Sequence, residues 1–95
     1  ELSGGEVLIA EMYLILNSNA EFCILDEPFS NVAPKYVEKM QELIQQHKAD
    51  KGIIISDHMY ESVIGITDDL FLLRDGYTFP IRSREDLIHH GYILR

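Results

Sequence analysis

Two adjacent acidic residues follow an apolar run in the first third of the chain. Asp26 and Glu27 come directly after the run at 22–25 and precede Pro28. Neighbouring residues at a strand end point in different directions, so one carboxylate can face a hydrated Mg²⁺ while the other faces an attacking water. An isolated Asp-Glu pair is more often a solvated turn. The apolar run favours a site here, because open α/β sheets bind ligands at the carboxyl ends of their strands.

A histidine follows the next apolar run. Residues 53–55 are all isoleucine and lead into Ser56, Asp57 and His58. If the two runs are parallel neighbours, His58 lies near Asp26 and Glu27, where its imidazole can reach a terminal phosphate and sense whether that group is present. No zinc pattern joins Cys23 to the remaining histidines, which we expect to be surface or packing residues: His47, His89 and His90.

A serine and two glycines near the start of the chain form a possible anion site. Ser3, Gly4 and Gly5 offer a hydroxyl and unobstructed backbone N–H groups where a helix is expected to begin. Ser3 and Glu6 also fit a capping box, in which both side chains satisfy free N–H groups of the first helical turn. The alternative is that these residues only cap a helix. Without Asp26, Glu27 and His58 elsewhere in the chain, that alternative would be preferred.

A strand, a helix and a second strand are expected to position these groups. The continuous apolar run at 22–25 predicts a buried strand of a parallel sheet over residues 22–26, and residues 53–56 predict another. The intervening crossover is long enough for parallel pairing, so the fold class is α/β. Its helix begins at Pro34 and has one mainly apolar face, formed by Val37, Met40, Leu43, Ile44 and His47.

Further helices and a hairpin are expected on either side of this unit. A helix from about residue 5 to residue 16 is apolar on nearly every face, which implies either burial all round or a surface for a partner. The later patterns predict, in chain order, a short helix at 59–64, a β-hairpin of 70–74 and 77–81 around Asp75-Gly76, and a last short helix capped by Ser83 and Asp86.

Composition excludes several classes of protein. The 95 residues suit one small domain, and 46% apolar residues are enough for a core. The net charge is −8 and the eight Lys and Arg residues are scattered singly, so no basic patch predicts nucleic-acid binding. The longest apolar stretch, residues 7–16, is too short to cross a bilayer. Cys23 is the only cysteine, which rules out an internal disulfide and suits a reducing compartment, and we expect it to be a small buried hydrophobe.

In their order and spacing these motifs resemble the C-terminal half of the nucleotide-binding domain of ABC transporters. Residues 2–6 resemble the signature motif, and the run ending at Asp26 resembles Walker B, with Glu27 as the catalytic glutamate. Residues 30–34 are similar to the D-loop region, and His58 is similar to the switch histidine. The resemblance extends over essentially the whole chain. It implies a partial P-loop NTPase (RecA-like) core with parallel strands, a crossover helix and a C-terminal β-hairpin.

The resemblance also implies the cofactors ATP and Mg²⁺ and a role for each site residue. Asp26 would bind Mg²⁺ through water, Glu27 would orient or deprotonate the attacking water, and His58 would stabilise charge on the γ-phosphate. Such domains close as a head-to-tail pair around two ATP molecules. In that arrangement the segment Ser3, Gly4 and Gly5 would contact the γ-phosphate of ATP held by the opposite subunit.

The implied partners are a second nucleotide-binding domain and transmembrane transporter subunits, with the chain on the cytoplasmic side of the membrane. No segment reads Gly-x-x-x-x-Gly-Lys-Ser/Thr, the loop that cradles nucleotide phosphates, and the chain begins without methionine. We therefore expect residues 1–95 to be a C-terminal fragment of the domain, without its Walker A half. The fragment alone is expected to lack ATPase activity and to self-associate, because the missing strand leaves backbone edges exposed.

Two other interpretations remain open. One is the C-terminal lobe of an SMC-like chromosome-maintenance ATPase, in which a long coiled coil precedes such a signature. The other is a degenerate, non-catalytic interaction module, suggested by the apolar first helix and by Ala33, which stands where the D-loop of the family usually has aspartate. The joint presence of Asp26, Glu27 and His58 argues against the degenerate module.

Overall fold

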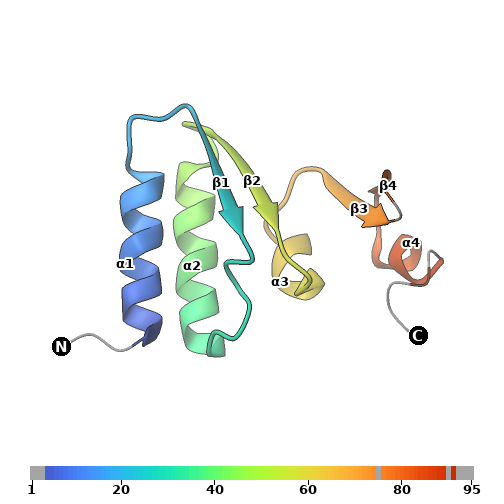
Figure 1. The fold of residues 1–95 in the computed structure, drawn as a ribbon, viewed down its shortest axis with the longest axis horizontal. Helices are drawn as coiled ribbons and strands as arrows, with labels where there is room; N and C mark the ends of the chain where they lie inside the picture. Colours follow the sequence, from blue (N-terminus) through green and yellow to red (C-terminus); the bar gives the residue numbers. More distant parts are fainter. Residues whose placement is uncertain (1–3, 75, 90, 92–95) are drawn as a thin grey trace.

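The structure is a computed structural model that describes residues 4–74, 76–89 and 91 of the chain. Helices and strands alternate along the first half, and a hairpin and a short helix follow (Figure 1). The elements are α1 (Gly4–Leu16), β1 (Phe22–Asp26), α2 (Pro34–His47), β2 (Gly52–Ser56), α3 (Tyr60–Ile64), β3 (Leu70–Arg74), β4 (Tyr77–Ile81) and α4 (Arg84–His89).

Strands β1 and β2 form a parallel pair, and α2 makes the crossover between them. Cys23 lies opposite Ile53, and Asp26 lies opposite Ser56. Helix α2 begins at Pro34, whose ring fixes the backbone angle that a first helical turn needs and whose missing N–H would have no partner there. The predicted mixed α/β class with a parallel strand pair is therefore confirmed.

The two helices α1 and α2 lie side by side and run in the same direction (Figure 1). Their N-terminal ends and the carboxyl ends of β1 and β2 point toward the same end of this unit. The helices meet closely where Gly5 of α1 faces Tyr36 of α2, because a Cβ atom at Gly5 would overlap the tyrosine ring. Any side chain at this position would therefore force the Tyr36 ring to move.

The main hydrophobic core lies on one face of the β1–β2 pair. It joins side chains of α1, β1, α2 and the segment that follows β2, and the prediction that Cys23 is a buried hydrophobe is confirmed. The core residues are Met12, Leu16, Cys23, Leu25, Phe29, Met40, Leu43, Ile44, Val63 and Ile66. A smaller cluster of Leu72, Ile81 and Leu87 joins β3, β4 and α4.

The other face of the β1–β2 pair is exposed, which corrects the expectation of a fully buried strand. Burial alternates along β1, so Phe22 and Ile24 are 70% and 69% exposed while Cys23 and Leu25 are buried. Ile54 of β2 is exposed in the same way. The reason is that the helices described above pack against one face only. The apolar run makes both faces of the strand suitable for burial, but it does not determine whether another element covers each face.

Helix α1 is likewise covered on one side only. Met12 and Leu16 are buried, whereas Tyr13, Leu14 and Ile15 are exposed. Of the two expectations for this helix, burial all round is therefore wrong. None of the helices formed by the described residues combines the length and the apolarity that crossing a bilayer requires.

The hairpin of β3 and β4 is antiparallel, with Leu70 opposite Ile81. Gly76 has a φ of +80°, a left-handed conformation that glycine adopts without a steric penalty, whereas Asp75 lies outside the described residues. At the start of α4 the Asp86 carboxylate accepts a hydrogen bond from the backbone N–H of Arg82 at 2.8 Å. A capping box would place that bond on Ser83, so the carboxylate reaches one residue further back than the pattern predicts.

Candidate active site

Glu27 and His58 lie together at the carboxyl end of the parallel strands. The backbone N–H of Glu27 donates to the carbonyl of Ser56, which extends the pairing of β1 and β2 by one step. Glu27 has a φ of +49°, so the chain turns sharply at this residue. Its Oε1 atom lies 3.3 Å from Nδ1 of His58. The expected proximity of these two side chains is therefore present in the structure.

The contact between Glu27 and His58 is open to solvent. The two side chains are 57% and 63% exposed, respectively. Exposed pairs of this kind contribute only about 0 to 1 kcal/mol to folding, so the pair adds little to the stability of the fold. A carboxylate and an imidazole at this distance are suited to orienting a water molecule and donating a hydrogen bond to an anionic group.

The pair borders a cavity with a volume of about 400 Å³. Its polar wall comes from the segment between β2 and α3 together with Glu27, and its apolar wall comes mainly from β3. The lining residues are Glu27, Ile55, Ser56, Asp57, His58, Tyr60, Val63, Leu70, Phe71, Leu72, Leu73 and Leu87. The two candidate catalytic residues thus face a hollow rather than a flat surface.

Asp26 is the last residue of β1, and its side chain is exposed. Within residues 4–74, 76–89 and 91 no group of three or more His, Cys, Asp and Glu residues could hold a metal ion. A Mg²⁺ ion does not need such a cage, because it keeps several waters and is usually held by one or two carboxylates together with substrate phosphates. The hard oxygen atoms of Asp26 fit that coordination.

The N-terminal candidate residues lie apart from the acidic pair. Gly4 and Gly5 open α1, and Ser3 lies outside the described residues, as does its predicted cap with Glu6. The start of α1 and the end of β2 are on opposite sides of α2 (Figure 1). The structure therefore brings Glu27 and His58 together and leaves Gly4 and Gly5 at a separate position.

Asp57 is an additional residue of the site to which the sequence patterns assign no role. Its side chain is completely buried, at 0% exposure. The carboxylate accepts hydrogen bonds from the backbone N–H groups of Phe29 at 2.8 Å and Met59 at 3.0 Å, and from the hydroxyl of Ser30 at 3.3 Å. The bond to Met59 spans two residues just before a helix, which is the Asx-turn that Asp commonly forms. That local preference was the one available indication in the sequence.

The connection between β1 and α2 has an unusual backbone. Glu27 and Asn31 have φ values of +49° and +58°, which are uncommon for residues other than glycine. Between them Phe29 is almost fully buried in the main core, at 1% exposure. Ala33 occupies the N-cap position of α2 and makes no side-chain cap. Asparagine adopts a left-handed conformation more readily than most residues, so local preference suits Asn31 but not Glu27.

The other described histidines are not part of this site. His47 is half-buried in the last turn of α2, and His89 is exposed at the end of α4. His90 lies outside the described residues. For His47 and His89 the expectation of a packing or surface position agrees with the structure.

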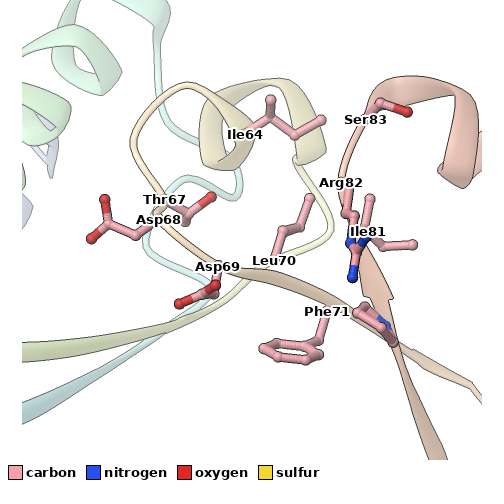
Figure 2. A pocket seen from close by; sticks show the side chains of 10 residues that line it. Ile64, Thr67, Asp68, Asp69, Leu70, Phe71, Ile81, Arg82 and Ser83 are labelled. Atoms are coloured by element: carbon pink, nitrogen blue, oxygen red, sulfur yellow. The ribbon is translucent and has the colours of Figure 1, made fainter.

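A second hollow lies between the segment that precedes β3 and the start of α4 (Figure 2). Its volume is about 390 Å³, and none of the candidate site residues lines it. Figure 2 shows Asp68 pointing away from Arg82, and the Asp68 carboxylate instead forms an ion pair with Lys48 at 2.9 Å. The lining residues are Ile64, Thr67, Asp68, Asp69, Leu70, Phe71, Pro80, Ile81, Arg82 and Ser83.

Several curated ATP-binding proteins of transport systems match the chain. No protein-family model matches the chain. The lipopolysaccharide export system ATP-binding protein LptB of Acidithiobacillus ferridurans is 33% identical over 92% of this chain and 36% of its own length. LptB of Escherichia coli K12 is 27% identical over 99% of this chain and 39% of its own length.

A protein of another transport system matches as well. The energy-coupling factor transporter ATP-binding protein EcfA2 of Mycoplasmoides gallisepticum is 38% identical over 80% of this chain and 24% of its own length. The chain thus spans only about a third of the length of the two LptB proteins. Over nearly its whole length, the chain is related to the ATP-binding proteins of ABC transporters.

Proposed function

We propose that residues 1–95 are the C-terminal part of an ABC-type nucleotide-binding domain, a segment of a RecA-like P-loop NTPase core without its Walker A half. The complete subunit binds and hydrolyses ATP and couples hydrolysis to transmembrane transport. The observation that carries this proposal is the 3.3 Å contact between Glu27 and His58 at the carboxyl end of a parallel strand pair. The relationship to transporter ATP-binding proteins supports it.

In this proposal the residues at the strand ends act on ATP bound by their own subunit. Glu27 orients or deprotonates the attacking water, and its exposed carboxylate beside His58 supports that role. His58 donates a hydrogen bond toward the γ-phosphate. Asp26 holds Mg²⁺ through water, and the ion, when bound, neutralises charge on the phosphates. The adjacent cavity of about 400 Å³ gives the reacting groups room.

The N-terminal segment acts on a different ATP molecule in this proposal. Ser3, Gly4 and Gly5 contact the γ-phosphate held by the opposite nucleotide-binding domain of a head-to-tail dimer. Gly4 and Gly5 open α1, and the start of α1 and the end of β2 lie on opposite sides of α2, which supports two distinct roles (Figure 1). Backbone N–H groups at the start of the 13-residue helix α1 suit contact with a phosphate.

We further propose that transmembrane transporter subunits are partners, that the subunit works at the cytoplasmic face of the membrane, and that residues 1–95 alone do not hydrolyse ATP. The names of the relatives favour a transporter over an SMC-like chromosome-maintenance ATPase. The contact of Glu27 with His58 favours a catalytic domain over a degenerate interaction module, because a module without nucleotide chemistry does not require this exposed pair.

The test is ATP binding and ATP hydrolysis by the complete protein that carries this sequence. Glu27→Gln keeps the shape of the side chain and removes its charge, so ATP binding persists while turnover falls at least about a hundredfold. Glu38→Gln, at an exposed position of α2, is the matched control and keeps full activity. Hydrolysis at the wild-type rate in Glu27→Gln would overturn the assignment.

A further inference from the structure

We propose that Asp57 is a positioning residue whose buried carboxylate fixes the β1–α2 connection so that Glu27 faces His58. The inference rests on the proposed function, because it assigns to Asp57 an effect on the same reaction. The Oδ1 atom of Asp57 lies 3.9 Å from Nδ1 of His58, which is beyond hydrogen-bond distance. Asp57 acts through the backbone of the two segments that carry Glu27 and His58.

The hydrogen bonds of Asp57 connect those two segments directly. Its Oδ2 atom accepts from the N–H of Phe29, two residues after Glu27, at 2.8 Å. Its Oδ1 atom accepts from the N–H of Met59, one residue after His58, at 3.0 Å. A single carboxylate therefore binds the chain beyond Glu27 and the chain beyond His58 at the same time.

The chemistry at this position calls for a group that only accepts hydrogen bonds. An ionised carboxylate has acceptor sites on both oxygens, and here three donors converge on it, the third being the Ser30 hydroxyl at 3.3 Å. An asparagine at position 57 would turn an NH₂ group toward at least one of these donors. A buried charge is costly unless hydrogen bonds compensate it. All three donors to Asp57 belong either to the connection between β1 and α2 or to the connection between β2 and α3.

The backbone conformation explains why the connection needs this support. Glu27 and Asn31 adopt left-handed φ values of +49° and +58°, and such residues persist only where the surrounding structure determines them. The hydrogen bond to Phe29 lies between these two residues. Without it, the connection is free to relax toward ordinary φ values, and the Glu27 carboxylate then turns away from His58.

The test compares Asp57→Asn and Asp57→Ala with the wild type in the complete protein. We expect kcat for ATP hydrolysis to fall about tenfold or more, because a small displacement of a reacting group costs that much, while KM for ATP changes less than about twofold. Rates are normalised to the amount of ATP bound, so that loss of folded protein is not counted as loss of catalysis. A normalised kcat within about twofold of wild type in both variants would overturn the inference.

Two further variants separate positioning from general damage. Asp68→Asn is the matched control, because its exposed carboxylate pairs with Lys48 and contacts neither connection, and it keeps the wild-type kcat. Ser30→Ala removes only the longest of the three bonds and is expected to lower kcat by about twofold to fivefold. If neither Asp57 variant folds, an unchanged kcat in Ser30→Ala would itself contradict the inference.

A double variant tests whether Asp57 acts through Glu27. In single-turnover measurements, adding Asp57→Asn to Glu27→Gln should slow hydrolysis no further than Glu27→Gln alone, since residues that act as a unit are not additive. Full additivity would overturn the inference. If Glu27→Gln hydrolyses ATP normally, the proposed function fails; if Glu27→Gln is inactive and Asp57→Asn is fully active, only the positioning role fails.

Discussion

The Nδ1 atom of His58 lies 3.3 Å from Oε1 of Glu27, although 31 positions of sequence separate the two residues. Two features bring them together. The parallel register places Asp26 opposite Ser56, so both strands end at the same level. The left-handed turn at Glu27 then directs its side chain to the strand that precedes His58.

Replacement of His58 tests the second half of this pair. In the proposed function, His58→Ala removes a donor that acts on developing phosphate charge, and such a loss lowers turnover by about a hundredfold or more. Steady-state hydrolysis by the complete protein measures the effect. His89→Ala is the control, because His89 is exposed in α4 and does not line the cavity at Glu27. Equal activity of the two variants would remove His58 from the mechanism.

The close approach of Gly5 to Tyr36 predicts opposite effects of alanine at two neighbouring glycines. Nothing lies near the position of a Cβ atom at Gly4, so Gly4→Ala leaves the free energy of unfolding unchanged or raises it by up to about 1 kcal/mol. Gly5→Ala forces the methyl group into the Tyr36 ring and lowers that free energy by about 1 to 3 kcal/mol. Urea denaturation measures both.

A double replacement identifies the cause of the Gly5→Ala effect. If the clash with the ring is responsible, the variant that carries Tyr36→Ala together with Gly5→Ala loses no more stability than Tyr36→Ala alone. An additive loss would mean that the cost arises elsewhere in α1. Gly52 offers a contrast, because the ring near its Cβ position belongs to exposed Phe22, which has room to move, and Gly52→Ala is expected to cost less.

The uncovered face of the β1–β2 pair predicts self-association of the 95-residue chain. Ile24 and Ile54 lie on adjacent strands of this face and are both exposed. Replacing both with threonine keeps the β-branched shape and lowers the apolar area, so light scattering should show a smaller average mass than for the parent chain. A monomeric parent chain would contradict the expectation. Leu25→Thr, on the buried face, should instead unfold the chain.

The anchor at Phe29 predicts a large stability difference between two phenylalanines. Phe29 lies in the main core, so Phe29→Ala should lower the free energy of unfolding by about 3 to 5 kcal/mol. Phe71 is 59% exposed, and Phe71→Ala should lower it by less than about 1 kcal/mol. Chemical denaturation of the complete protein compares them, and similar losses would mean that Phe29 is not an anchor of the fold.

Much of the α/β arrangement could be predicted because local patterns and tertiary packing agree. In α2, a proline at the start and one mainly apolar face specify both the element and the side that packs on the core. The uncovered face of β1 could not be predicted in the same way. Phe22 and Ile24 are as apolar as Cys23 and Leu25, and only the placement of the helices distinguishes the two faces.

The candidate site, too, could be predicted only in part. The proximity of Glu27 and His58 follows from two apolar runs that each end in polar residues, because parallel neighbours end at one edge of a sheet. The burial of Asp57 could not be inferred, since two of its three partners, Phe29 and Ser30, belong to the distant β1–α2 connection, and the left-handed turn at Glu27 is not indicated by residue type. Ser3, named from the sequence as a phosphate contact, lies outside the described residues.

Because Asp26 is paired with Ser56, the length of each strand sets the distance between Glu27 and His58. One residue removed from β2 would draw His58 back by about 3.3 Å and turn the following side chains to the opposite face of the strand. Insertions and deletions within these strands would therefore separate Glu27 from His58 even when both residues are retained. The spacing of the chain, as much as the identity of its acid and its histidine, sets whether the pair forms.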